Sequence, residues 1–356
     1  MTYKGIKGRG IASNFESRFL TQRTEAVDDG WFKEPDDDAS RPRTEIFAEN
    51  CRSILSHNQS PDIPFNLSIN PYKGCEHGCA YCYARPSHAY LDLSPGLDFE
   101  TKIFAKPNAA GLLSKAFNKS AYQPEVIALG ANTDPYQPTE RKLEITRQIL
   151  EVLHDYRHPV TIVTKSALIE RDIDILREMA QRDLVHVALS VTSLRNELCR
   201  RLEPRATAPR RRLRAIARLA ESGIPVTVLF APVIPILNDN EMESVLTAAH
   251  EAGARSASYV MLRLPHEVKQ LFQEWLQTYY PLKAKRIMNI VREMREGREY
   301  DARFGIRQTG SGAYAELFAQ RFRLKSKKLG IDKTMSALDI THFIRPPLPG
   351  QQLEMF

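Results

Sequence analysis

Cys75-Glu76-His77-Gly78-Cys79-Ala80-Tyr81-Cys82 is the stretch of this sequence from which the fold can be predicted. It holds three of the five cysteines, in the spacing C-x3-C-x2-C. Alternating apolar and polar residues at 65–70 predict a strand just before it, and Pro71-Tyr72-Lys73-Gly74 predicts a turn. We therefore expect the cysteines on a loop that leaves a strand, where functional side chains are commonly displayed.

Three interpretations of this cysteine loop compete. A structural zinc site needs four ligands, usually in two separated pairs, so His77 or His88 would have to complete it. A disulfide would use two of the cysteines and leave the third alone. A [4Fe–4S] cluster can be held by three cysteines, with its fourth iron open to another ligand. The spacing, the aromatic Tyr81 before the last cysteine and the preceding strand favour the cluster.

At these residues the chain resembles the radical SAM superfamily, whose hallmark is C-x3-C-x-aromatic-C after the first strand of a partial barrel. The resemblance implies that Cys75, Cys79 and Cys82 ligate a [4Fe–4S] cluster. It also implies that the amino and carboxylate groups of S-adenosyl-L-methionine bind the open iron, with Tyr81 beside the adenine.

A closer resemblance is to the subgroup around spore photoproduct lyase, which includes DNA-repair-photolyase-like proteins. The motifs that carry it are Asn132-Thr133-Asp134-Pro135-Tyr136-Gln137-Pro138-Thr139-Glu140, Thr164-Lys165-Ser166 and Leu189-Ser190-Val191-Thr192. The resemblance covers roughly residues 60–270 and continues more weakly to about 330. One departure concerns the chemistry. That lyase returns a hydrogen atom from a cysteine after the second strand, whereas residues 132–134 contain none and Cys199 lies on another loop.

The composition is that of an ordinary globular chain. Its 356 residues are enough for one large domain or two small ones, and 42% of them are hydrophobic. The clustered cysteines indicate ligand thiols in a reducing compartment. The first ten residues lack the apolar segment of a signal peptide, and the longest apolar run, 226–237, contains two prolines and is too short to span a bilayer. We therefore expect a cytoplasmic location.

From residue 65 onward, short β-branched runs alternate with longer helical patterns. Strands are predicted at 65–70, 125–130, 160–164, 185–190, 225–230 and 257–262, and helices near 108–118, 139–157, 167–182, 209–222 and 240–252. Such alternation produces a parallel sheet with right-handed crossovers. Because six units are too few to close an eight-stranded barrel, we predict an α/β fold, an open partial (β/α)6 barrel.

Four regions are predicted along the chain. Residues 1–60 form an N-terminal extension with an acidic stretch near its middle, and its residues 9–19 resemble a leader of the subgroup. Residues 61–265 form the radical SAM partial barrel, 266–330 a C-terminal helical region, and 331–356 a loose, proline-rich tail.

Polar motifs follow the predicted strand ends. Because the carboxyl ends of parallel strands meet at one edge, we expect residues 75–82, 132–134, 165–166 and 190–192 to converge on one rim. Thr133 and Asp134 suit the ammonium group of the cofactor. Lys165 suits its carboxylate, and Ser190 suits its ribose or carboxylate. The ordinary alternatives are a turn-forming Asp134 before a proline and a solvated Lys165.

Positive charge is concentrated in residues 195–218, which hold nine arginines and two glutamates, a net charge equal to the +7 of the whole chain. A second basic run lies at 321–328. The ordinary explanation is a solvated helix face. The alternative is a phosphate-contacting surface near the mouth of the barrel, which leads to the hypothesis of a nucleic-acid or phosphate-bearing substrate.

The predicted function is that of a radical SAM enzyme. It would cleave S-adenosyl-L-methionine reductively at the [4Fe–4S] cluster to a 5′-deoxyadenosyl radical, which abstracts hydrogen from a substrate such as a nucleic acid. An external one-electron reductant is then a required partner, and no membrane partner is expected. The alternatives are a radical SAM enzyme acting on a peptide or small molecule, and a non-catalytic module that binds a cluster or zinc.

Overall fold

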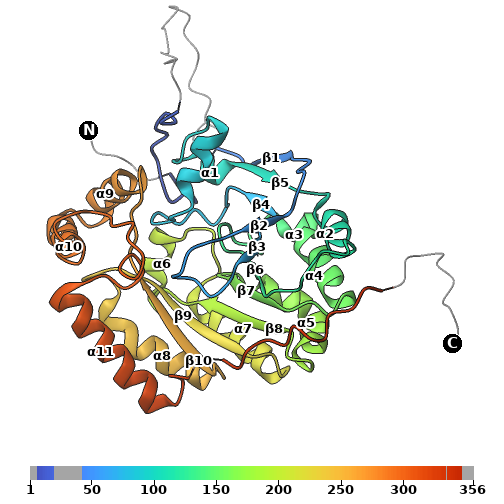
Figure 1. The fold of residues 1–356 in the computed structure, drawn as a ribbon. Coiled ribbons are helices and arrows are strands. Elements are labelled where there is room, and N and C mark those ends of the chain that lie inside the picture. Colours follow the sequence, from blue (N-terminus) through green and yellow to red (C-terminus); the bar gives the residue numbers. More distant parts are fainter. Residues whose placement is uncertain (1–5, 20–41, 334, 347–356) are drawn as a thin grey trace, which may run out of the picture.

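A computed structural model describes residues 6–19, 42–333 and 335–346 of the chain (Figure 1). Within these residues the main sheet has seven strands in the order β10-β9-β8-β7-β6-β3-β2. The strands are β2 (Leu55–His57), β3 (Leu67–Ile69), β6 (Ile127–Leu129), β7 (Val160–Thr164), β8 (Val185–Ser190), β9 (Val226–Val233) and β10 (Ser256–Met261). All neighbours are parallel except β2 and β3, which are antiparallel.

Helices connect the parallel strands and cover the outer face of the sheet (Figure 1). In chain order they are α2 (Ala109–Phe117), α3 (Glu140–Leu143), α4 (Ile145–Asp155), the 3-10 helix η3 (Ala167–Asp172), α5 (Ile173–Ala180), α6 (Asn196–Leu202), α7 (Pro209–Glu221), the 3-10 helix η4 (Asp239–Glu241) and α8 (Met242–Glu251). Their apolar faces follow the helical period. For example, α4 buries Ile145, Ile149 and Leu153.

The open α/β barrel is confirmed. All six predicted strands form and are mutually parallel, and in the described part of the chain the sheet ends at β10 and β2 without closing. Alternate residues of β7 are fully buried and the others half-buried, as expected for a parallel sheet with both faces covered. The predicted helix at 139–157 is divided into α3 and α4, because Glu144 has a positive φ of 51°.

A second, smaller sheet was not predicted. It has the order β1-β5-β4, formed by β1 (Glu45–Ala48), β5 (Lys102–Ala105) and β4 (Tyr72–Lys73). It adjoins the 3-10 helix η2 (Arg85–Leu91) and the short α1 (Asp98–Thr101). Because β4 leads directly into Cys75, this sheet supports the start of the cysteine loop.

The predicted C-terminal helices are present. They are α9 (Val268–Tyr279), α10 (Pro281–Glu293) and α11 (Gly312–Leu329), and α11 packs along α8 (Figure 1). No helix in the described part of the chain is long and apolar enough to cross a membrane.

Parts of both predicted terminal regions are incorporated into the fold. β2, inside the predicted extension, adds a strand to the main sheet. The described part of the predicted loose tail is docked, because Phe343 packs 5.8 Å from the ring of Phe117 and the Ile344 N–H donates to the Tyr156 carbonyl at 3.0 Å. Most of the predicted acidic stretch, within 20–41, and the end of the tail, 347–356, lie outside the described residues. The four region boundaries stay a prediction.

Candidate cofactor site

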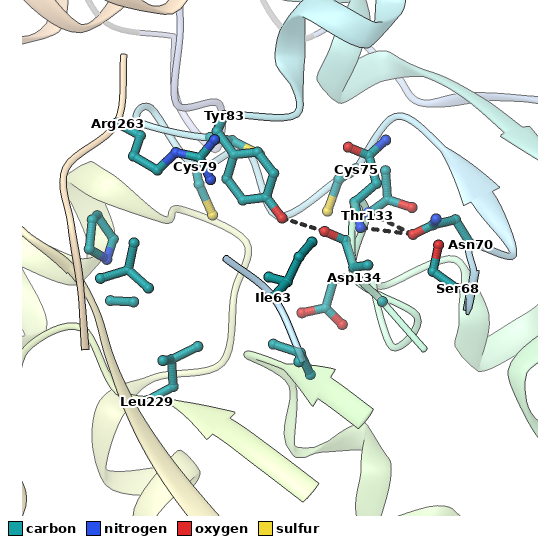
Figure 2. A pocket seen from close by; sticks show the side chains of 18 of the residues that line it. Ile63, Ser68, Asn70, Cys75, Cys79, Tyr83, Thr133, Asp134, Leu229 and Arg263 are labelled. Atoms are coloured by element: carbon teal, nitrogen blue, oxygen red, sulfur yellow. Dashed lines mark hydrogen bonds between the residues drawn. The ribbon is translucent and has the colours of Figure 1, made fainter. Parts of the chain in front are cut away.

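A cavity of about 590 Å³ opens at the carboxyl ends of the parallel strands (Figure 2). Seven of the eight predicted site residues line it: Cys75, Cys79, Cys82, Tyr81, Thr133, Asp134 and Lys165. The eighth, Ser190, is fully buried behind Lys165 and does not line the cavity. The predicted convergence of the strand ends on one rim is therefore what the fold produces.

The cysteine loop is anchored through its backbone. The Cys75 N–H donates to the Phe99 carbonyl at 2.9 Å, and the Ala80 N–H donates to the Leu202 carbonyl at 2.9 Å. In Figure 2 the sulfur atoms of Cys75 and Cys79 point into the cavity. All three loop thiols are free, so the disulfide interpretation is not supported.

The donor set of this loop fits an iron–sulfur cluster. Within the described chain, no three His, Cys, Asp or Glu side chains are spaced to hold a single metal ion, as a zinc site would require. Three cysteines that each ligate a different iron of one cluster do not need that spacing. Burial raises the pKa of the Cys79 and Cys82 thiols, so binding of iron would displace their protons.

Asp134 joins the cysteine loop to the end of β7. Its Oδ2 lies 3.3 Å from His77 Nδ1 and accepts the Lys165 N–H at 2.7 Å, while its Oδ1 accepts the Thr164 hydroxyl at 2.7 Å. Burial opposes the charged form of both partners, but Asp134, together with Cys75, raises the pKa of His77 to about 10, and His77 lowers that of Asp134 to about 2. His77 is therefore committed to an ion pair and not to zinc, and Asp134 already has protein partners on both oxygens.

Lys165 is a cationic side chain that lines the cavity beside the cysteine loop. Its Nζ donates to Ser190 Oγ at 3.1 Å and lies 5.9 Å from the centroid of the Tyr81 ring. The Ser190 hydroxyl in turn donates to the Ala231 carbonyl at 3.2 Å. Ser190 thus orients the ammonium group of a lysine that lines the cavity.

Thr133 is held by the strand ends next to it. Its hydroxyl donates to the Tyr72 carbonyl at 2.8 Å, which leaves the oxygen able to accept one further hydrogen bond. Asn70, just after β3, accepts the backbone N–H of Asn132 at 2.8 Å (Figure 2). The segment 132–134 is therefore fixed before any ligand binds.

The sequence analysis did not predict the buried ion pair that lies beneath the cysteine loop. Arg212, on the buried face of α7, pairs with Glu203, and both side chains are essentially inaccessible to solvent. Glu203 also accepts the hydroxyl hydrogens of Tyr81 and of Thr192, the latter at 2.6 Å. Burial would raise the pKa of Glu203, but Arg212 and Lys165 lower it to about 2. The ring of Tyr81 is thereby fixed at its hydroxyl end.

The remaining candidate ligands lie away from the cavity. Cys199 is buried, and its Sγ lies 3.6 Å from the Ser193 carbonyl oxygen. Cys51 lies near Asn108. His88 does not line the cavity, and its Nε2 is 3.0 Å from the Lys102 carbonyl oxygen. In the described chain, the cavity lining contains no cysteine beyond the three of the loop.

Many arginines of the basic segment 195–218 pair with carboxylates, of which Glu76, Glu170 and Glu241 come from outside the segment. Six of its arginines have an acidic partner within 4.0 Å: Arg195 with Glu241, Arg201 with Glu197, Arg205 with Glu76, Arg211 and Arg218 with Glu170, and Arg212 with Glu203. Among the described residues, Arg200, Arg210 and Arg214 are exposed and have no such partner. The solvated-face interpretation therefore holds for much of this segment, and Arg212 is a core residue.

Comparison with known proteins agrees with this geometry. Residues 69–249 match the radical SAM superfamily. An uncharacterised protein of Mycobacterium tuberculosis is 35% identical over 247 residues, which is 68% of this chain and 72% of the relative. An uncharacterised protein of Methanocaldococcus jannaschii is 27% identical over 199 residues, 56% of this chain and 71% of that relative. The chain therefore belongs to the radical SAM superfamily.

Solved structures show the same fold. Spore photoproduct lyase complexed with dinucleoside spore photoproduct has a TM-score of 0.55 and 14% identity, over 80% of this chain and 79% of that chain. A cysteine-to-serine variant of the same lyase gives a TM-score of 0.56 at 15% identity over the same shares. At such low identity the likeness shows the fold alone. Membership of the superfamily supports chemistry that depends on S-adenosyl-L-methionine.

Proposed function

We propose that the protein is a radical SAM enzyme whose cluster is held by Cys75, Cys79 and Cys82. When bound, the [4Fe–4S] cluster passes one electron from an external reductant to S-adenosyl-L-methionine, which gives methionine and a 5′-deoxyadenosyl radical able to abstract hydrogen from a substrate. The observation that carries the proposal is that three free cysteines and Lys165 line the same cavity at the strand ends.

Lys165 is the residue that we propose for the carboxylate of the cofactor. Its ammonium group is held by Ser190 above the Tyr81 ring, so little ordering is needed on binding. Tyr81 offers a ring edge for the adenine while its hydroxyl is held by Glu203. For the cofactor ammonium we propose Thr133, whose oxygen retains acceptor capacity. Asp134 contributes as the anchor of His77 and of the Lys165 backbone.

The competing class is a module that holds a cluster only for structure. It would not need a lysine ammonium in a cavity of about 590 Å³ beside the thiols. A radical SAM enzyme acting on a peptide or small molecule remains the alternative within the enzyme class. The nucleic-acid hypothesis rests on the exposed arginines of 195–218 and on the fold shared with an enzyme that was solved with a dinucleoside photoproduct.

Anaerobic reconstitution with iron and sulfide tests the proposal. We expect cluster absorbance, and an electron paramagnetic resonance spectrum of the reduced protein that changes when S-adenosyl-L-methionine is added. Cys79→Ala should abolish cluster uptake, because two thiolates hold a cluster poorly, whereas Cys199→Ala should retain it since Cys199 lies outside the cavity. Full iron and sulfide content in Cys79→Ala, or a spectrum that is insensitive to S-adenosyl-L-methionine, would refute the proposal.

A further inference from the structure

Two arginines reach the cavity from the part of its wall formed by β10 and the C-terminal region. Arg263 follows β10, and Arg307 lies in the loop between α10 and α11. Arg307 has partners within the protein, because its Nε lies 2.5 Å from Asp62 Oδ2 and a terminal nitrogen donates to the Ser60 hydroxyl. Arg263 differs from it in having no such partner.

The guanidinium of Arg263 lies over the ring of Tyr83, 5.1 Å from its centroid. Figure 2 shows the two side chains next to each other. Within the described residues Arg263 makes no hydrogen bond and no ion pair, and its Nε is buried without a partner. A buried donor that lacks an acceptor costs free energy. Because Arg263 lines the cavity, its unsatisfied guanidinium is available to donate to a molecule bound there.

The positive charge around Arg263 indicates that the bound molecule is negatively charged. Arg295 lies nearby and donates from its terminal nitrogens to the carbonyls of Leu262 and Ile306, at 3.1 and 2.6 Å. Burial lowers the pKa of Arg295, and the nearby charge of Arg263 lowers it further. The two guanidinium groups therefore repel each other, and an anion beside Arg263 would relieve this repulsion.

The carboxylates closest to these arginines are committed to other partners. Asp62 is shared between Arg307 and the Gly305 N–H, the latter at 2.6 Å. Asp301 pairs with Arg303 at 2.6 Å. Asp62 also interacts electrostatically with Arg263, but neither carboxylate accepts a hydrogen bond from it, so a bound anion would supply the acceptor that the protein itself does not.

We propose that Arg263, supported by the ring of Tyr83, binds an oxyanion of the substrate, a phosphate or a carboxylate. The inference rests on the proposed function and deepens it by naming the substrate class. Arg263 is three strands along the sheet from Lys165, since β10 is separated from β7 by β9 and β8. The cavity therefore has one cation beside the cofactor residues and a second one for the substrate. A planar guanidinium fork matches either oxyanion.

Binding of matched charged and neutral probes to the reconstituted, unreduced full-length chain tests this assignment. The first pair is thymidine 5′-monophosphate and thymidine, and the second is benzoate and benzamide, both followed by ligand-observed NMR titration. We expect the charged member of at least one pair to bind about tenfold more tightly or better, as for a charge-assisted hydrogen bond. The pair with the larger preference identifies phosphate or carboxylate as the group. Absence of preference in both pairs would overturn the proposal.

Two variants test whether Arg263 causes the preference for the charged probe. Arg263→Gln should remove it, while Arg255→Gln, an equal loss of charge at an exposed position just before the same strand, should keep it. Arg263→Gln should also retain wild-type iron content, response to S-adenosyl-L-methionine and melting temperature, because no described residue bonds to Arg263. A preserved preference in Arg263→Gln overturns the inference, and so does loss of S-adenosyl-L-methionine binding, which would assign Arg263 to the cofactor. Failure of cluster uptake in the wild-type chain would instead refute the proposed function.

Discussion

At the scale of single residues, the site distinguishes side chains that face the cavity from those that hold them. Lys165 lines it, and Ser190 holds the lysine's ammonium group from behind, whereas Asp134 lines the cavity too but accepts the backbone N–H of Lys165. All three are polar residues at strand ends, and the sequence predicts a direct contact with the cofactor for each of them. Their roles differ in the folded chain because the side-chain oxygens of Ser190 and Asp134 accept hydrogen bonds from Lys165.

Lys165→Ala is expected to weaken S-adenosyl-L-methionine binding by about 1.5–3 kcal/mol, the contribution of a charge-assisted hydrogen bond. The measurement is the titration of the cofactor followed by cluster spectroscopy. Lys115→Ala on the exposed face of α2 removes the same charge far from the cavity and serves as the control. An unchanged titration in Lys165→Ala would exclude the lysine from the cofactor site.

At the scale of elements, the N-terminal leader is part of the support of the cysteine loop. Glu100 is fully buried and accepts the N–H groups of Gly10 and Ile11 at 2.9 and 3.1 Å, and it pairs with Arg85 at 2.5 Å. Gly10 packs so closely that an added Cβ would lie 1.7 Å from the Gly78 carbonyl oxygen. The leader thus packs against the loop backbone between Cys75 and Cys79.

Gly10→Ala should therefore destabilise the protein by about 1–3 kcal/mol, as for overpacking, and should speed the loss of iron from the reconstituted chain. Gly111→Ala is the matched control, because its added Cβ meets nothing within 4 Å and it lies inside α2. That control should gain about 0.5–1 kcal/mol. Urea denaturation and timed iron release measure the two effects. Equal behaviour of the two variants would mean that the leader does not support the loop.

A second contact between elements makes the stability of the folded protein depend on pH. Glu170 of η3 accepts from Arg211 and Arg218 of α7, at 2.8 Å in each case. Burial opposes its ionisation, but the two arginines outweigh this and lower its pKa below the ordinary 4.5. A lowered carboxyl pKa stabilises the folded state above the unfolded value, and this contribution is lost as the pH falls through the folded value.

Glu170→Gln should consequently lower the free energy of unfolding by about 0.5–1 kcal/mol at pH 7, a small effect because both arginines are partly exposed. At pH 3 the difference from the wild-type protein should shrink, as followed by urea denaturation at both pH values. A decrease that is as large at pH 3 as at pH 7 would contradict the ionic origin.

At the scale of the whole molecule, the excess positive charge is smaller on the surface than its clustering in the sequence predicts. Carboxylates from other elements neutralise Arg211, Arg218 and Arg195, and Arg212 is buried in the core. Arg210 and Arg214 remain exposed, four residues apart on α7 and hence on one face. A phosphate-binding surface would have to use this face.

If nucleic acid binds there, the double variant Arg210→Gln and Arg214→Gln should reduce the slope of log affinity against log salt by about 0.9 for each phosphate that is no longer neutralised. The same measurement on Lys283→Gln with Lys285→Gln, on the exposed side of α10, provides the control. Equal slopes in both variants and in the wild-type chain, or no binding of single- or double-stranded DNA or RNA, would discard the nucleic-acid hypothesis.

The open barrel, the order of its strands along the chain and the cysteine loop follow from the sequence alone, because hydrophobic period and ligand spacing are local properties. Which charges meet is settled only in the folded molecule. The pairing of Glu203 with Arg212 and the docking of Phe343 join residues that approach each other only when the chain folds. The unpaired Arg263 has the same cause, since Asp62 binds Arg307 instead. Which charged side chains pair depends on their proximity in three dimensions, and this proximity cannot be predicted from the hydrophobic period of the sequence.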